Sequence, residues 1–165
     1  MFYFLNIYLV ERKEKQLILP FVSRNVINLI VNNYSIICCL RINQKIDFND
    51  FPSKSEFNDL LKKVNLHDKV PFYYKNKNWI FLLKKRQVAT LSQINRIFLF
   101  GKHIDEELRK ILLEMQCSLY LQDNYAFNAD DFKDENLSKY SLVFYNHFKL
   151  IEELNTYYEK NLKTY

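Results

Sequence analysis

The sequence is almost without glycine: Gly101 is the only one among 165 residues. Loops that cradle phosphate groups or nucleotides use glycine to bring backbone N–H groups close to the ligand. One glycine cannot supply a G-x-G-x-x-G motif, a Walker loop or the G-x-S-x-G turn of serine hydrolases. The sequence therefore excludes the glycine-dependent nucleotide-binding and hydrolase motifs.

Histidine and cysteine are also scarce, with three of each. No pair among them has metal-ligand spacing, so we expect no metal site. His147 falls on the apolar side of an expected helix, where a hydrogen-bonded core histidine is the simplest interpretation. Cys117 is expected inside a helix, without the helix N-terminus or neighbouring cation that would lower the pKa of a reactive thiol. We predict neither a cofactor nor an enzymatic activity.

The cysteine count and the first residues indicate a compartment. The chain has an odd number of cysteines, namely Cys38, Cys39 and Cys117, so they cannot all pair in disulfides within the chain. This count favours reduced thiols, as in a cytoplasm. Residues 1–10 are apolar but have no basic leader and no small-residue cleavage site, and charged residues follow at once. We expect a cytoplasmic protein that does not bind membranes.

Length and composition predict one domain over residues 1–165. Apolar residues make up 48% of the chain and aromatic residues 16%, far more than a disordered chain carries. The patterns favour an α+β fold, in which a mainly antiparallel sheet from the first 100 residues packs against two C-terminal amphipathic helices. One or two short helices are expected in the N-terminal half.

Several apolar runs have the length and composition of strands. Residues 2–10 and 16–22 are predicted to form an opening hairpin, and residues 70–74 and 79–83 a second hairpin. The remaining predicted strands are 35–42, 87–91 and 96–100, although residues 92–100 are also compatible with a helix.

Helices are predicted where apolar residues recur at three- and four-residue steps. A short helix is expected over residues 23–33. Ser53 and Glu56 match the capping-box pattern, so a second helix should begin there. Two longer amphipathic helices are predicted from Ile104 to about Leu119 and from Tyr140 to Leu162.

Charge is shared unevenly along the chain. Residues 1–102 hold 17 Lys or Arg against 7 Asp or Glu, whereas residues 103–165 hold 7 against 12. Carboxylates and aromatic residues are interleaved in the acidic part, and such a segment can dock on a basic protein surface. A solvated loop is the simpler alternative. The predicted partner-binding residues are Asp123, Tyr125, Phe127, Asp130, Asp131, Asp134 and Glu135.

The basic part offers an alternative site at the expected hairpin of residues 70–86. Cations can contact phosphates while aromatic rings stack on bases, as in grooves for single-stranded nucleic acid. Lysine outnumbers arginine, which argues against bidentate phosphate recognition, and a solvated hairpin end is the simpler alternative. The residues of this alternative site are Lys75, Lys77, Trp79, Lys84, Lys85 and Arg86.

The leading hypothesis is a small protein that binds and neutralises another protein. An immunity protein for a toxin, or an inhibitor encoded by a mobile element, has the expected properties, since inhibitors of nucleases often imitate nucleic acid with carboxylates. The expected partner is a protein, such as a toxin with a basic active-site cleft. The alternative is a nucleic-acid-binding module.

Overall fold

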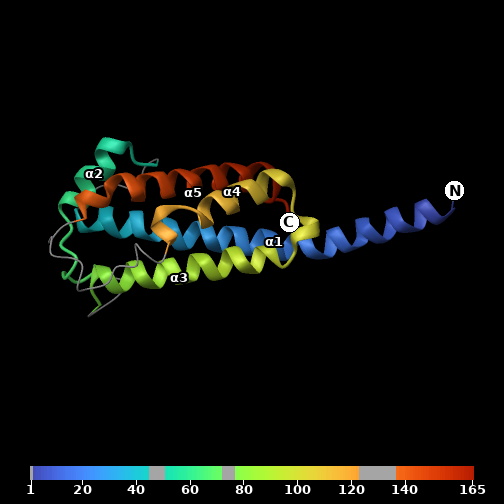
Figure 1. Ribbon diagram of the computed structural model, residues 1–165, viewed down its shortest axis with the longest axis horizontal. Coiled ribbons are helices and arrows are strands. Elements are labelled where there is room, and N and C mark those ends of the chain that lie inside the picture. The colour runs from blue at the N-terminus through green and yellow to red at the C-terminus, as the bar shows by residue number, and fades with distance from the viewer. Residues whose placement is uncertain (1, 45–50, 72–76, 123–136) are drawn as a thin grey trace.

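The computed structural model describes residues 2–44, 51–71, 77–122 and 137–165 (Figure 1). Five α-helices account for most of this part: α1 (Phe2–Asn43), α2 (Lys54–Lys62), α3 (Trp79–Phe98), α4 (Glu106–Gln116) and α5 (Ser141–Asn161). Single 3-10 turns lie at Gly101–His103, Leu119–Leu121 and Ser138–Tyr140. The described part contains no β-strand, so the fold is all-α and the α+β prediction is wrong.

Helix α1 replaces the predicted opening hairpin, the short helix over residues 23–33 and the strand at 35–42. Its buried residues follow helical spacing from Leu19 through Val22, Val26 and Leu29 to Leu40. Exposed apolar residues between them, with Pro20 in their midst, obscured that period in the sequence. Pro20 removes one backbone donor, and the neighbouring turns continue the helix across it.

Helix α3 replaces the predicted strands at residues 79–83, 87–91 and 96–100. Its buried face includes two polar residues, Gln87 and Thr90, which interrupted the apolar pattern. Between residues 69 and 78 the structure has an isolated antiparallel bridge that joins Lys69 to Asn78, with Val70 N–H donating to the Lys77 carbonyl oxygen over 3.0 Å. The Asn78 side chain then caps α3 by accepting from Phe81 N–H at 3.0 Å.

Three predicted helices are confirmed. Ser53 is the N-cap of α2, and its hydroxyl accepts from Glu56 N–H at 3.3 Å, as the capping-box pattern indicates. Asp105 caps α4 through Leu108 N–H at 2.9 Å. Helix α5 buries Phe144, Phe148, Ile151 and Leu154 as its apolar spacing predicted, and it buries Tyr157 where Tyr158 was expected.

Helix α1 packs against both α3 and α5. Figure 1 shows α3 along one side of α1, α5 along the other side and α2 at the end near Asn43, while α4 packs on α5 and α3. The side chains of all five helices join one hydrophobic core, in which Trp79 and Tyr120 are the largest fully buried residues. The C-terminal end of α5 is tied to α1 where Ser23 donates to the Leu162 carbonyl oxygen over 3.0 Å.

The start of α1 projects beyond the other helices (Figure 1). The carboxylate of Glu14 pairs with the Lys102 ammonium group at 2.6 Å, which fixes α1 to the turn that follows α3. This ion pair holds the pKa of Glu14 below its usual value. We call residues 2–13 the N-terminal arm.

Among the described residues, α1 is also the one helix that is long and apolar enough to cross a membrane, over Leu9–Asn43. Half of its most apolar window is buried inside the bundle. Core helices of soluble bundles and signal sequences near an N-terminus pass the same test of length and composition, and the contacts of α1 with α3 and α5 account for its buried face.

Candidate binding groove

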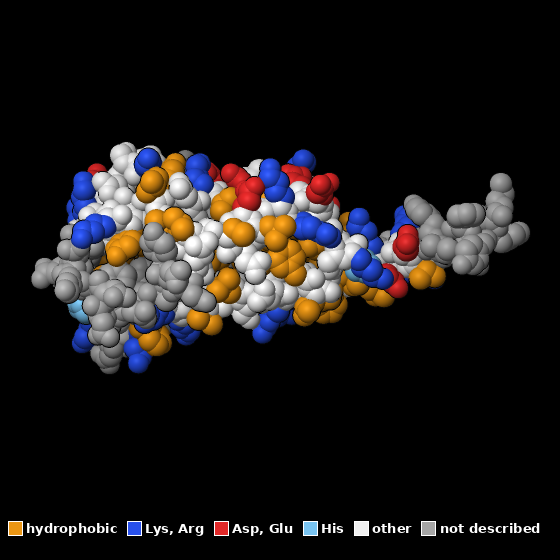
Figure 2. All heavy atoms as spheres, viewed as in Figure 1, with side chains coloured by type: hydrophobic (Ala, Val, Ile, Leu, Met, Phe, Trp, Pro, Cys, Tyr) orange, Lys and Arg blue, Asp and Glu red, His pale blue; other side chains and the backbone are white. Residues whose placement is uncertain are grey.

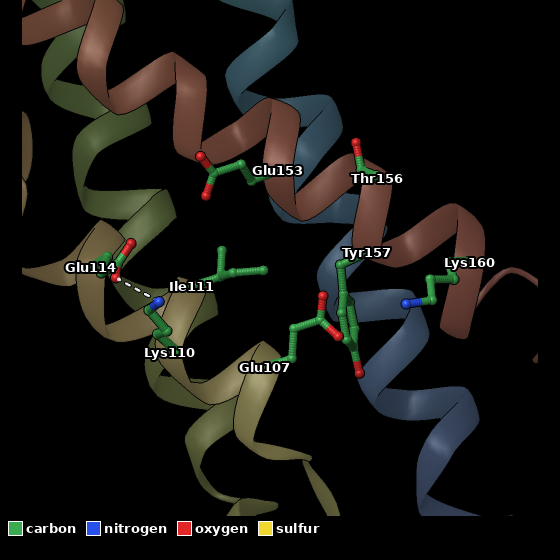
Figure 3. Close-up of a pocket in the computed structure, with 8 residues that line it drawn as sticks. All are labelled: Glu107, Lys110, Ile111, Glu114, Glu153, Thr156, Tyr157 and Lys160. Atoms are coloured by element: carbon green, nitrogen blue, oxygen red, sulfur yellow. Dashed lines mark ion pairs between the residues drawn. The ribbon is translucent and has the colours of Figure 1, made fainter.

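A groove of about 370 Å³ lies between α4 and α5 (Figure 3). Four of its lining residues come from α4 at helical spacing and four come from α5. We call it the α4–α5 groove; its residues are Glu107, Lys110, Ile111, Glu114, Glu153, Thr156, Tyr157 and Lys160.

The middle of the groove is apolar and its rim is charged. Ile111 points from α4 toward α5, and the Tyr157 ring lies beside it (Figure 3). Both side chains are almost fully buried, at 8% and 4% exposure. The surface over α4 and α5 carries carboxylates and ammonium groups close together (Figure 2). This arrangement offers a dry contact area surrounded by charge.

Three carboxylates and two ammonium groups make up the charged rim. Glu114 lies 3.9 Å from Lys110, at the limit of an ion pair. Within the part of the chain that the structure describes, Glu107 and Glu153 have no ion-pair partner. A cation entering the groove would therefore meet two carboxylates that form no ion pair, with the Lys160 ammonium group also on the rim.

A hydrogen bond to Asp105 holds the Tyr157 side chain in place. Its hydroxyl donates to Asp105 Oδ2 at 2.7 Å, while Asp105 Oδ1 caps α4. Burial, assisted by this hydrogen bond to a carboxylate, raises the pKa of Tyr157 above its usual value. One aspartate thus fixes both the start of α4 and the wall of the groove.

A chain of hydrogen bonds crosses the core. Ser118 Oγ lies 3.0 Å from His147 Nδ1, and His147 Nε2 lies 3.3 Å from Asn33 Oδ1. The Asn33 amide donates to Thr90 Oγ1 at 3.0 Å. These residues join α1, α3 and α5 to the end of α4. The prediction that His147 is a hydrogen-bonded core residue is confirmed.

The pair of Ser118 and His147 has the outline of a nucleophile and a base, but the electrostatics oppose that role. Complete burial lowers the pKa of His147 to about 3. An imidazole this weakly basic accepts a proton from serine poorly at neutral pH. The network therefore satisfies buried polar groups, as such networks commonly do.

The structural position of Cys117 differs from the predicted one. It is the C-cap residue of α4 and is exposed, whereas a helix interior was expected. With Ser118 and Leu142 it lines an open cavity of about 320 Å³. Cys38 is half-buried and Cys39 is buried, and burial raises the pKa of Cys39 to about 11. All three thiols are free.

The predicted partner-binding residues lie outside the described residues, since all seven fall within 123–136. Sequence reasoning did not select the α4–α5 groove. The signal available was the acidic character of residues 103–165, together with Glu107 and Glu114 two helical turns apart. Nothing in the sequence indicated that α4 and α5 lie side by side.

The alternative nucleic-acid site is not on a hairpin. Lys75 lies outside the described residues, and the other five residues are on α3 or next to its start. Trp79 is fully buried in the core, so it cannot stack on a base. Arg86 donates to Asn32 Oδ1 at 2.6 Å within the bundle. Lys77 lies over the Phe81 ring at 4.9 Å from its centroid.

Within the described residues, no group of three or more His, Cys, Asp or Glu is arranged to hold a metal ion. No protein-family model matches the chain, and comparisons with curated proteins and with solved structures found no match. The fold and the groove define a class in structural terms: an all-α bundle with a charged, mainly acidic interhelical groove.

Proposed function

We propose that this protein binds and neutralises another protein, and that a basic surface of that partner docks on the α4–α5 groove. The proposal rests on one observation. The apolar side chains of Ile111 and Tyr157 lie in the same groove as Glu107 and Glu153, two carboxylates without an ion-pair partner among the described residues. A lysine or arginine side chain of the partner fits this combination. Its aliphatic stem would lie on Ile111 and Tyr157 while its charged end meets the carboxylates.

The partner would be recognised by charge as well as by shape. Opposite charge across an interface speeds association and disfavours acidic competitors. A toxin or nuclease with a basic cleft has this chemistry, so an immunity protein or an inhibitor encoded by a mobile element remains the role we propose. A cytoplasmic location fits it, since the three thiols of the chain are free.

Charge reversal in the groove tests the proposal. The partner is first captured from the native host, and its affinity is then measured by calorimetry. Replacing Glu107 and Glu153 together with lysine is expected to weaken this affinity by about 100-fold, or about 2.7 kcal/mol, because each change replaces an attraction by a repulsion. The activity of the captured partner, measured with and without the protein, reports whether binding also neutralises it.

Matched controls are available on the same helices. Glu106 on α4 and Glu159 on α5 are exposed and do not line the groove. Reversing these two changes the net charge equally and is expected to leave the affinity within about 3-fold of the wild type. Equal affinity of the groove variant and the wild-type protein would contradict the proposed site.

Nucleic-acid binding is the second candidate, and one observation favours it. Exposed lysines lie at the C-terminal end of α2 and just before α3, namely Lys62, Lys63 and Lys77. Such a surface can contact phosphates without reading bases. The burial of Trp79 removes the stacking platform that would retain a single strand.

Filter binding at low salt separates the two candidates. We expect no retention of single- or double-stranded DNA or RNA at micromolar protein, because the docking proposal requires none. Retention that weakens with the logarithm of the salt concentration, with a slope of about 0.9 per neutralised phosphate on a duplex, would favour the second candidate.

A further inference from the structure

The outer face of α1 carries an apolar stripe that nothing in the described part of the chain covers. Val10, Leu17 and Phe21 are 56%, 71% and 61% exposed. They repeat at steps of seven and four residues, so they lie on one face of the helix, opposite the buried Leu19 and Val26. An exposed apolar stripe of this kind marks an interaction surface.

The spacing is that of a coiled coil. Taking Val10 and Leu17 as d positions of a heptad places Glu14 and Phe21 at a positions. The stripe from Val10 to Phe21 spans about 17 Å of helix at ~1.5 Å per residue.

The surroundings leave room for a second helix. The arm, residues 2–13, projects beyond the other helices (Figure 1), and Leu17 and Phe21 continue the stripe along the exposed side of α1 next to the bundle. Glu14, the polar residue in the stripe, already pairs with Lys102 of its own chain. Its charge is therefore compensated before any partner arrives, which lowers the cost of covering it.

We propose that α1 pairs with α1 of a second copy of this chain through the stripe, forming a two-fold homodimer. A second copy supplies the same heptad register by definition, and a two-fold axis lets each stripe cover the other. A lipid bilayer fits less well, because the charged residues Glu11, Arg12 and Lys15 interrupt the apolar sequence between residues 10 and 17. In a helix pair these charges stay in water beside the seam, whereas insertion past residue 10 would bury them.

Light scattering after size-exclusion chromatography tests the dimer on the full chain. The expected mass is about 40 kDa, twice the 20.1 kDa of one chain. Replacing Leu17 and Phe21 together with lysine is expected to raise the dimer dissociation constant by about 100-fold and to give monomers at micromolar concentration. Circular dichroism checks that the variant keeps its helices, which is expected because both positions face away from the core.

The control is a matched pair of exposed apolar residues on α3. Val88 and Leu99 are 68% and 81% exposed. Replacing them with lysine adds the same charge and should leave the dimer intact. A monomeric wild-type protein at 100 µM or more, or dissociation by both variants alike, would overturn the proposal.

Sedimentation with vesicles of phosphatidylcholine and phosphatidylserine tests the bilayer as the alternative. The dimer proposal predicts that the wild-type protein stays in the supernatant. Co-sedimentation of a monomeric wild-type protein, lost in the Leu17 and Phe21 variant, would show that lipid covers the stripe and would overturn the dimer.

Discussion

Trp79→Ala is expected to destabilise the protein by about 4 kcal/mol, within the range of roughly 3–5 kcal/mol for removing a large aromatic side chain from a core. Trp79 is the first residue of α3 and is fully buried. Its removal leaves a cavity that the surrounding helices can fill only in part. Urea unfolding followed by far-UV circular dichroism measures the loss.

Val88 on the same helix provides the control for this measurement. It is 68% exposed, so Val88→Ala should change the free energy of unfolding by less than about 0.5 kcal/mol. A Trp79→Ala variant within about 1 kcal/mol of the wild type would mean that the ring is not part of the core. The intrinsic fluorescence of Trp79, the single tryptophan, should also be blue-shifted in the folded protein.

Acid is expected to weaken the fold through His147. Its pKa is lowered from 6.5 to about 3 by burial, so the unfolded chain binds a proton between these values and the folded chain does not. The stabilisation from the neutral imidazole is complete above about pH 6.5 and is lost as the pH falls toward 3. Between pH 7 and pH 4 the loss attributable to His147 is about 3 kcal/mol.

The His147→Gln variant isolates this contribution. Carboxylates also titrate in acid, but they are common to both proteins, so the difference between the two stability profiles reports His147 alone. The variant should start less stable at pH 7 and lose less stability on acidification. His67→Gln is the control, because His67 is exposed and its side chain takes no part in the buried hydrogen-bond network of His147. Parallel profiles for His147→Gln and the wild type would contradict the buried neutral histidine.

The sequence was most informative where a helix carries its own boundary signals. Ser53 and Glu56 marked the start of α2, and the acidic residues after Ile104 marked the first turn of α4. These signals act within a few residues, so they can be read without knowing the rest of the fold. The stripe of α5 was visible because its apolar residues are large and regularly spaced.

The helical character of residues 2–43 and 79–98 was missed for a physical reason. β-Branched and aromatic residues favour strands weakly, and tertiary packing overrides that preference. In α1 the apolar residues occupy both the buried face and the exposed stripe, so the helical period is hidden in an almost continuous apolar sequence. In α3 the helical period is hidden for the opposite reason. Two polar residues, Gln87 and Thr90, occupy core positions where apolar residues would be expected.

The groove could not be predicted because it depends on how helices pair. Glu107 and Glu153 are 46 positions apart in the sequence, and only the packing of α4 on α5 brings them to one cavity. The predicted acidic site and the groove belong to the same acidic part of the chain. Charge composition indicated where along the chain acidic side chains concentrate, whereas the residues that line the groove depend on the tertiary structure.

The packing of α1 against α3 and α5 has a consequence for synthesis. A ribosome makes α1 before the helices that cover its buried face, α3 and α5, which come from residues 79–98 and 141–161. Until these residues are made, the nascent chain presents Val22, Val26 and Leu29 to solvent without their final neighbours. Chains stalled before residue 141 should be bound by chaperones and cleaved by proteases, because exposed apolar surface marks an incompletely folded chain.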